Sequence, residues 1–391
     1  MRVLVLGADG YLGWPMAMHL ALKSDEVGVL DSGIKRIWES EVGGAPLISI
    51  PPLAERARLF GRATNRSLTV FEGDLLDAAF VQRVLEDFVP DSVVHFAEQP
   101  SAPYSMIDLE HAVATQHNNV VGTLNLLFSL RDTCPSAHLV KLGTMGEYGT
   151  PNIDIEEGFL EVEHKGRRDR LPFPKQPGSF YHLSKVHDSH NIQFACRTWG
   201  LRSTDLNQGV VYGMQTDETL IDPDLGTSFH YDAVFGTVLN RFCVQAMIGE
   251  ALTVYGTGGQ HRGFINIRDT LKCVDLALHH PPAQGEYRVF NQFTEVFGVA
   301  DLALRVQEAA RELGISVTIR SLENPRVESE QHYYNPVRRL LDELGLNPTR
   351  LSDELLGSML RFLGDRHHLV RRERLDPDVS WKGSVSNAGA V

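Results

Sequence analysis

The chain has 391 residues, 42% of them hydrophobic, and a formal net charge of −13 at neutral pH. This length and composition can bury a large core, which we expect to form two lobes of one subunit. The negative charge argues against nucleic acid or an anionic membrane as a partner, because both would repel it. Any anionic ligand must then be held by a few local arginines.

The four cysteines are scattered and form no C-x-x-C pair, so we expect reduced core thiols and predict no metal site. No stretch approaches the length of a membrane span. The first residues already resemble a strand, which leaves no room for a signal or transit peptide. We therefore expect a cytoplasmic protein.

The first apolar run, Val3 to Leu6, is continuous and resembles a buried parallel strand. Gly7, Gly10 and Gly13 follow it in a G-x-x-G-x-x-G turn, and Pro15 lies near the first turn of the next predicted helix. Such a turn lets backbone N–H groups and a helix N-terminus approach a pyrophosphate. A plain structural turn is the alternative interpretation.

Asp31 ends the second apolar run, Val27 to Leu30, where a carboxylate can accept hydrogen bonds from a ribose diol. The same carboxylate would repel a 2′-phosphate, so the sequence favours NAD over NADP. Lys35 and Arg36 follow closely, either as a solvated loop pair or as adenosine contacts.

Further strands are predicted at 68–72, 92–96, 138–143 and 202–207, alternating with helical stretches. This pattern predicts an α/β fold, a doubly wound parallel sheet of the Rossmann type with a smaller C-terminal substrate lobe. The long connection 33–66 exceeds what a simple crossover needs. Asp74, in Gly73-Asp74-Leu75, is either a plain turn residue or an adenine contact. We expect a cofactor domain over 1–210, a partly interleaved substrate lobe over 211–380, and a loose tail over 381–391.

Thr144 closes the predicted strand that begins at His138, so its hydroxyl should lie at the carboxyl edge of the sheet. Tyr181 and Lys185 are four residues apart on a predicted helix and therefore share one face. We expect the ammonium group to lower the pKa of the phenol, which makes Tyr181 a usable base. Together with the glycine turn, these residues indicate a nucleotide-dependent oxidoreductase site.

The glycine turn, Asp31, Thr144 and the Tyr181/Lys185 pair resemble the extended short-chain dehydrogenase/reductase family, in its nucleotide-sugar branch. The resemblance extends from residue 1 to about 365 and rests on unusual runs. These are Ser101–Ile107 (SAPYSMI), Lys141–Glu156 (KLGTMGEYGTPNIDIE), Ser179–Ile192 (SFYHLSKVHDSHNI), Asp205–Gly213 (DLNQGVVYG), Phe290–Glu295 (FNQFTE) and Asn324–Asn335.

The resemblance implies an enzyme that converts UDP-glucose and sulfite to a UDP-linked sulfosugar, through 4-keto and 4-keto-5-ene intermediates, on a tightly held NAD. Thr144, Tyr181 and Lys185 would act at C4. Hexose 4,6-dehydratases carry an Asp-Glu pair after the threonine, whereas this chain has Met145-Gly146. Glu147 and His182 are therefore the candidates for proton transfer at C5 and C6, with a structural His182 as the alternative.

The resemblance also implies binding residues. For NAD they are Gly7, Gly10, Tyr11, Leu12, Gly13, Asp31, Ser32, Arg36, Asp74, Leu75, Phe96, Ala97, Asn118, Leu142, Tyr181 and Lys185. For the UDP-sugar they are Ser101, Thr144, Met145, Asn207, Gln208, Tyr255, Gln260, Arg262 and Arg326. A homodimer is implied by the family's usual helix packing, and sulfite would be free or delivered by a donor protein.

One departure stands out, because Pro100 occupies the position of a family arginine in Glu-Gln-Arg-Ser-Ala-Pro-Tyr-Ser-Met. Proline offers neither a side-chain donor nor a backbone N–H to an anion. Two alternatives therefore stay open: a sulfite-independent UDP-hexose 4-epimerase or dehydratase, and a catalytically silent NAD-binding sensor. The intact Thr144, Tyr181 and Lys185 disfavour the sensor.

Overall fold

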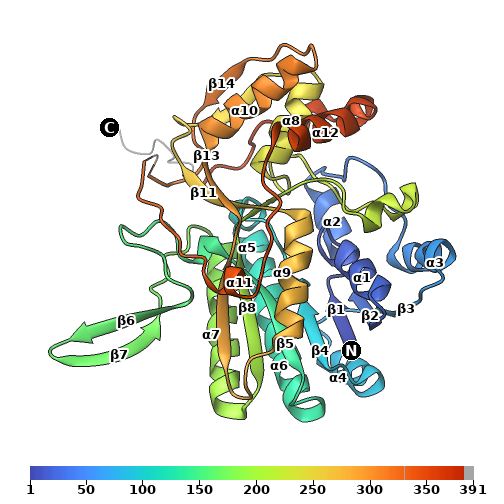
Figure 1. The fold of residues 1–391 in the computed structure, drawn as a ribbon, viewed down its shortest axis with the longest axis vertical. Helices are drawn as coiled ribbons and strands as arrows, with labels where there is room; N and C mark the ends of the chain where they lie inside the picture. Colours follow the sequence, from blue (N-terminus) through green and yellow to red (C-terminus); the bar gives the residue numbers. More distant parts are fainter. Residues whose placement is uncertain (330, 383–391) are drawn as a thin grey trace, which may run out of the picture.

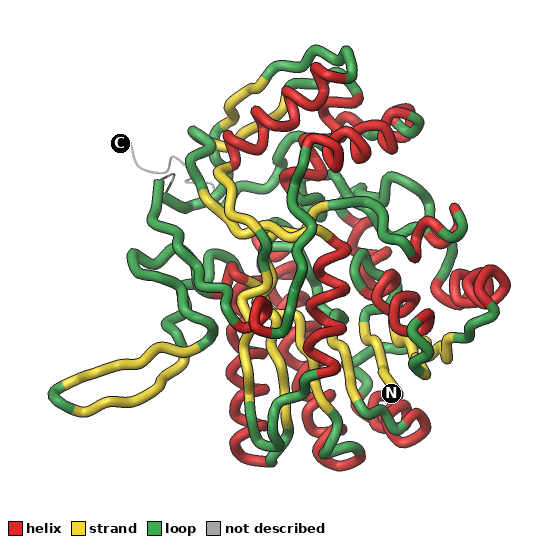
Figure 2. Tube along the Cα trace, viewed as in Figure 1, coloured by secondary structure: helices red, strands yellow, loops and turns green. Residues whose placement is uncertain are grey.

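The computed structural model describes residues 1–329 and 331–382, and a seven-stranded parallel sheet is its centre. The predicted strands all form, with bounds within one or two residues of expectation. Figures 1 and 2 show the strands side by side in the larger part of the molecule. Their order across the sheet is β12 (Tyr287–Gln292), β8 (Arg202–Gln208), β5 (His138–Thr144), β4 (Ser92–His95), β1 (Arg2–Leu6), β2 (Glu26–Asp31) and β3 (Leu68–Glu72).

Helices cover both faces of the sheet, because its strands alternate buried apolar side chains toward each face. Val3 and Val5 belong to one core cluster, whereas Leu4 and Leu6 belong to another. The first cluster includes side chains of α1 (Gly13–Leu22), α3 (Leu53–Thr64), α9 (Ile267–His279) and α11 (Leu340–Glu343). The second includes side chains of α4 (Ala78–Phe88), α6 (Gly122–Thr133) and α7 (Phe180–Trp199), and α5 (Leu109–Gln116) packs beside α7.

A smaller lobe stands over the carboxyl edge of the sheet and has its own core around Phe242 and Phe264 (Figure 1). It contains α8 (Val238–Met247), α10 (Val299–Glu312), α12 (Asp353–Gly364), the strand pair β10 (Leu252–Tyr255) and β14 (Ile319–Leu322), and the three strands β9 (Val210–Tyr212), β11 (His261–Asn266) and β13 (Glu295–Gly298). Strand β12 and helix α9 fall between these segments in sequence yet pack on the main sheet.

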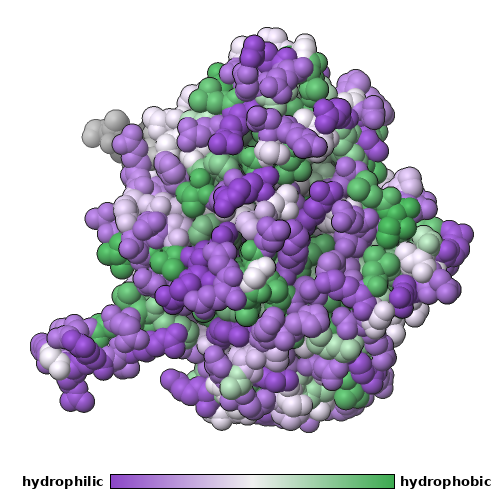
Figure 3. Space-filling model, viewed as in Figure 1, coloured by the Kyte–Doolittle hydropathy of each residue, from purple (hydrophilic) through white to green (hydrophobic). Residues whose placement is uncertain are grey.

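Three features differ from the sequence-based expectations. The long connection 33–66 carries two helices, α2 (Ile34–Glu41) and α3. Strand β12 was not predicted. The antiparallel hairpin of β6 (Phe159–His164) and β7 (Arg167–Pro172) was not predicted either; it projects from the body, and its surface is largely hydrophilic (Figures 1 and 3). In the described residues, no helix is both long and apolar enough to cross a membrane.

Candidate active site

A cavity of about 1320 Å³ lies between the carboxyl edge of the sheet and the smaller lobe. Gly10 and Asp31 line it from the sheet, and Tyr255 and Arg262 line it from the lobe. Open α/β sheets bind ligands at this edge. Pockets for one drug-sized ligand measure roughly 300–1,000 Å³, so this cavity has room for two ligands side by side.

The glycine turn has the close backbone contacts that a dinucleotide site needs. Gly7 has a φ of +80°, and a Cβ there would lie 2.6 Å from the Ala97 nitrogen. A Cβ on Gly13 would lie 2.1 Å from the Gly7 carbonyl oxygen, so only glycine lets α1 begin against the turn. The N-terminus of α1 therefore opens onto the cavity, where it can bind a pyrophosphate.

Asp31 lies at the end of β2, with one carboxylate oxygen 2.8 Å from the Asp9 nitrogen and the other 2.7 Å from the Gly33 nitrogen. Arg36 is not a solvated loop residue, because its guanidinium donates two hydrogen bonds to Asp9, at 2.6 and 2.9 Å. A guanidinium committed to Asp9 is poorly placed to bind a 2′-phosphate. The arrangement fits the ribose diol of NAD.

The structure brings the other predicted cofactor residues to the same cavity wall. Asn118 lies in a π-helical turn, His117–Val121, a distortion that is frequent at functional sites. All sixteen residues predicted for NAD line the cavity: Gly7, Gly10, Tyr11, Leu12, Gly13, Asp31, Ser32, Arg36, Asp74, Leu75, Phe96, Ala97, Asn118, Leu142, Tyr181 and Lys185.

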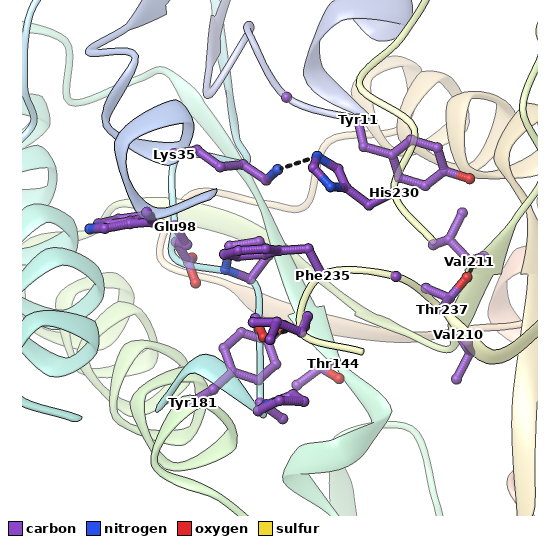
Figure 4. A pocket seen from close by; sticks show the side chains of 18 of the residues that line it. Tyr11, Lys35, Glu98, Thr144, Tyr181, Val210, Val211, His230, Phe235 and Thr237 are labelled. Atoms are coloured by element: carbon purple, nitrogen blue, oxygen red, sulfur yellow. Dashed lines mark hydrogen bonds between the residues drawn. The ribbon is translucent and has the colours of Figure 1, made fainter. Parts of the chain in front are cut away.

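Thr144 and Tyr181 lie next to each other in the wall of the cavity (Figure 4). Lys185 lies one turn along α7, with its Nζ 5.8 Å from the centre of the Tyr181 ring and 2.7 Å from the Leu142 carbonyl oxygen. Its ammonium group also forms an ion pair with Glu98, a buried residue that follows β4 and lines the cavity.

The expected lowering of the Tyr181 pKa is wrong for the protein alone. Burial raises the pKa of this phenol, and the nearby Glu98 carboxylate raises it further, against the opposing charge of Lys141. The reason is that Glu98 neutralises Lys185, the cation on which the prediction relied. Tyr181 therefore holds its proton firmly in the absence of further positive charge.

His182 also lines the cavity, and its imidazole packs against Gly146. A Cβ at Gly146 would lie 2.3 Å from the ring, so the imidazole fills the space that a side chain at this position would need. The Ser179 hydroxyl binds Nδ1 at 2.9 Å. Burial and the charges of Arg326 and Arg262 lower the pKa of His182 to about 3, so the ring is neutral.

Glu147 does not reach the cavity, which corrects its prediction as a catalytic residue. Its side chain is fully buried, 2.9 Å from Lys175 Nζ and 3.4 Å from Lys141 Nζ. Burial opposes ionisation, but these two ammonium groups hold the pKa of Glu147 below its usual range. The motif T-M-G-E is a capping box, in which Glu147 accepts a hydrogen bond from the Thr144 backbone.

Asn207 is likewise absent from the cavity, in contrast to the prediction. Neighbouring residues of a strand point to opposite faces, so Asn207 and Gln208 cannot both face the ligand. The Asn207 amide donates to the Tyr148 hydroxyl at 2.7 Å inside the protein, while Gln208 lines the cavity. The other predicted substrate residues line the cavity as well: Ser101, Thr144, Met145, Tyr255, Gln260, Arg262 and Arg326.

Three guanidinium groups face the cavity from the smaller lobe, and sequence reasoning missed one of them, Arg241. Arg262 forms an ion pair with Glu328. Arg241 donates to the Tyr255 hydroxyl at 3.0 Å, and neither it nor Arg326 has a carboxylate partner among residues 1–329 and 331–382. This wall carries surplus positive charge in an acidic protein and suits a ligand with several phosphate oxygens.

Sequence reasoning also missed Glu98 and Trp381, which both line the cavity. Glu98 could have been found, because it follows β4 at the carboxyl edge of the sheet, where functional groups gather. Trp381 carried no local signal, since it begins the segment expected to be a loose tail. Its backbone nitrogen bonds the Pro325 carbonyl at 2.8 Å, which corrects that expectation for Trp381, whereas 383–391 lie outside the described residues.

Comparison with known proteins identifies the family of this chain. The model of the NAD dependent epimerase/dehydratase family matches residues 3–291. The chain belongs to this family. It is 54% identical to the chloroplastic UDP-sulfoquinovose synthase of Spinacia oleracea, over 97% of this chain and 79% of that protein. It is 45% identical to the UDP-sulfoquinovose synthase of Sulfolobus acidocaldarius, over 98% of each chain.

Solved structures share the family fold. The UDP-glucose 4-epimerase of Thermotoga maritima, determined with UDP-glucose, has a TM-score of 0.68 at 19% identity and covers 95% of this chain and 100% of its own. The Thermus thermophilus UDP-glucose 4-epimerase, in complex with NAD, has a TM-score of 0.64 at 24% identity and covers 94% and 99%. NAD is the cofactor of this family, as its description and the predicted cofactor residues agree.

The buried position of Glu147 generates a prediction about stability. Glu147→Gln leaves Lys141 and Lys175 without one counter-charge, so we expect a loss of about 3 kcal/mol in unfolding free energy at pH 7. Because the folded-state pKa of Glu147 is lowered, its contribution is present at neutral pH and is lost as the pH falls through that pKa. The wild-type and variant curves should therefore converge in acid, as measured by urea unfolding.

Glu161→Gln is the matched control, because Glu161 lies on the exposed hairpin with its carboxylate 4.0 Å from Arg170. It should change the stability by less than about 0.5 kcal/mol. Normal stability of Glu147→Gln together with a large loss of turnover would restore the catalytic interpretation.

Proposed function

We propose that this protein is a UDP-sulfoquinovose synthase, which converts UDP-glucose and sulfite to UDP-sulfoquinovose. One observation carries the proposal: the Thr144–Tyr181–Lys185 group and the cationic wall face one cavity, in a chain 54% and 45% identical to two proteins of that name. The cavity has the volume for a dinucleotide beside a nucleotide sugar.

Oxidation at C4 of the hexose begins the reaction. Tyr181 accepts the proton of the C4 hydroxyl. Thr144 hydrogen-bonds the same C4 oxygen and so fixes its orientation toward Tyr181. Bound NAD supplies the hydride acceptor and a positive charge that opposes the Glu98 carboxylate. Lys185 anchors this arrangement by its bond to the Leu142 carbonyl oxygen.

Loss of water across C5 and C6 follows, because the 4-ketone acidifies the C5 proton. His182 is the base that we assign to this step. Its ring lines the cavity and fills the space beside Gly146, where dehydratases carry a carboxylate, and this geometry supports the assignment. The proton from C5 leaves with the C6 hydroxyl as water, which produces the enone.

Addition of sulfite completes the cycle. The sulfur lone pair of bisulfite forms a bond to C6, the proton that bisulfite loses enters the solvent pool, and the solvent supplies the new proton at C5 in place of the one lost as water. Tyr181 then gives its proton back to the C4 oxygen, and bound NAD would supply the hydride that reduces C4. The net change replaces the C6 hydroxyl by a sulfonate and releases water, with no net use of cofactor. Arg262, Arg326 and Arg241 hold the diphosphate and draw anions into the cavity.

Two variants separate the first two steps. Tyr181→Phe removes the proton acceptor at C4, so we expect a loss of more than about a hundredfold in turnover and no absorbance of reduced cofactor after UDP-glucose is added, with NAD content retained. His182→Asn should still reduce the cofactor but lose incorporation of solvent deuterium at C5. Mass spectrometry of the recovered sugar and absorbance at 340 nm report the two steps. Near-normal product formation by Tyr181→Phe would reject the mechanism.

A sulfite titration separates the synthase from a sulfite-independent epimerase or dehydratase. Pro100 lines the cavity and provides no hydrogen-bond donor to an anion. We expect the wild-type protein to form the sulfonated sugar, and Pro100→Arg to form it at equal or lower sulfite concentration, by up to about tenfold. Pro100→Ala is the control without charge. A 4-keto or epimerised product that is indifferent to sulfite would contradict the synthase assignment.

A homodimer and a cytoplasmic location stay predictions. Support for the dimer comes from α5, where Leu109 is 79% and Val113 is 56% exposed, and from Phe180 and Phe194 on the adjacent α7, at 46% and 50%. Such a grouped apolar face favours association with a second copy. Light scattering should give twice the chain mass of 43.6 kDa, and a monomer mass at micromolar concentration would refute the dimer.

A further inference from the structure

The C-terminal strap, residues 371–382, contributes Arg371, 377–379 and Trp381 to the cavity lining and is held to the protein at several points. The Arg371 nitrogen donates to the Tyr231 hydroxyl at 2.8 Å, and the Arg374 carbonyl accepts from the Ala233 nitrogen at 3.0 Å. Leu375 is buried in the core of the smaller lobe. The strap is therefore a packed part of the cavity wall. Trp381 is its residue next to the last.

Trp381 stacks on Arg326, with the guanidinium carbon 5.1 Å from the centre of the indole ring. Both side chains line the cavity. The Trp381 backbone nitrogen donates to the carbonyl oxygen of Pro325, the residue before Arg326. The backbone and the side chain of Trp381 therefore contact two neighbouring residues of the same segment. This contact joins a residue near the chain terminus to an arginine on the substrate side.

The contact between Trp381 and Arg326 leaves the guanidinium N–H donors free to bind a ligand. An indole ring attracts a guanidinium by its face, so the N–H donors at the guanidinium edge stay free. A carboxylate partner would instead occupy those donors, as Glu328 does for Arg262. Arg326 forms no ion pair with a carboxylate in residues 1–329 and 331–382; burial lowers the pKa of its guanidinium, and the nearby Glu328 carboxylate raises it against the charge of Arg262. Trp381 therefore orients the Arg326 guanidinium without occupying its N–H donors.

We propose that Trp381 is a positioning residue for the substrate, which holds the Arg326 guanidinium toward the diphosphate of a nucleoside diphosphate ligand. The proposal deepens the assigned function and rests on a nucleotide-sugar site in this cavity. The strap then sets affinity for the diphosphate and leaves the chemical step at Tyr181 unchanged.

The test is a double-mutant cycle on the full-length, NAD-loaded protein, with UDP as the probe and calorimetry as the readout. Trp381→Ala should weaken UDP binding about tenfold, raise the KM for UDP-glucose by a similar factor, and leave kcat and NAD content within about twofold. Trp381→Phe, which keeps an aromatic face, should recover most of the affinity. In an Arg326→Ala background, Trp381→Ala should cause no further loss, because it acts through that arginine.

Intrinsic fluorescence gives a second readout. UDP should change the emission of the wild-type protein and of Trp199→Phe, whose indole packs against Phe128 on another part of the molecule. The change should be smaller in Trp381→Phe, which keeps only Trp38 as an indole in the cavity wall. Additive losses in the cycle, or unchanged UDP affinity of Trp381→Ala, would overturn the proposal. If wild-type protein binds no UDP at all, the proposed function itself fails, which is a separate outcome.

Discussion

A buried ion pair between Lys141 and Glu147 supports the whole catalytic edge of the sheet. Lys141 Nζ lies 3.4 Å from a Glu147 oxygen and 3.2 Å from the Lys185 carbonyl oxygen, which it binds. The Glu147 carboxylate in turn accepts from the Thr144 backbone nitrogen. Moving two ions out of water costs several kcal/mol each, so such a pair persists only in well-fixed geometry. It therefore joins β5, which carries Thr144, to α7, which carries Tyr181 and Lys185.

Charge is distributed unevenly along the cavity, and this asymmetry fits its two ligands. On the sheet side the cations Lys185 and Arg36 are paired with Glu98 and Asp9, whereas the smaller lobe presents Arg241 and Arg326 without an ion pair in the described residues, beside Arg262. In a protein with a net charge of −13, the arginine wall is a local exception that can draw an anionic sugar nucleotide to one end. Burial and the Glu98 carboxylate both raise the pKa of Tyr181 and keep that phenol protonated.

The fold is shared with epimerases, so the distinction between family members must lie in a few side chains. Gly146 and His182 are the clearest case here. The glycine removes a side chain that would collide with the imidazole, and the imidazole then reaches the cavity. One small residue thus lets an imidazole occupy this part of the cavity wall, while the backbone stays that of the family.

Local sequence predicted the strands, the glycine turn and the shared helical face of Tyr181 and Lys185, because each of these features depends on residues close together in the chain. The continuous apolar run Val3–Leu6 and further strand-like runs alternating with helical stretches predicted six strands of the main sheet. The glycine turn predicted the binding site for the pyrophosphate of the dinucleotide, because glycine tolerates the φ of Gly7 and the close contact at Gly13. The four-residue spacing placed Tyr181 and Lys185 on one helical face, beside Thr144 at the strand end.

Tertiary structure alone decided which of the candidate side chains face the ligand and with what charge. Asn207 and Gln208 are neighbours in sequence, yet the pleat of β8 turns one inward and the other to the cavity. Glu147 was drawn inward by Lys141 and Lys175, and Glu98 cancelled the effect of Lys185 on Tyr181. Trp381 packs on Arg326, although the two residues are 55 positions apart in the sequence. Each of these outcomes depends on burial and on partners distant in sequence, and no local pattern encodes either.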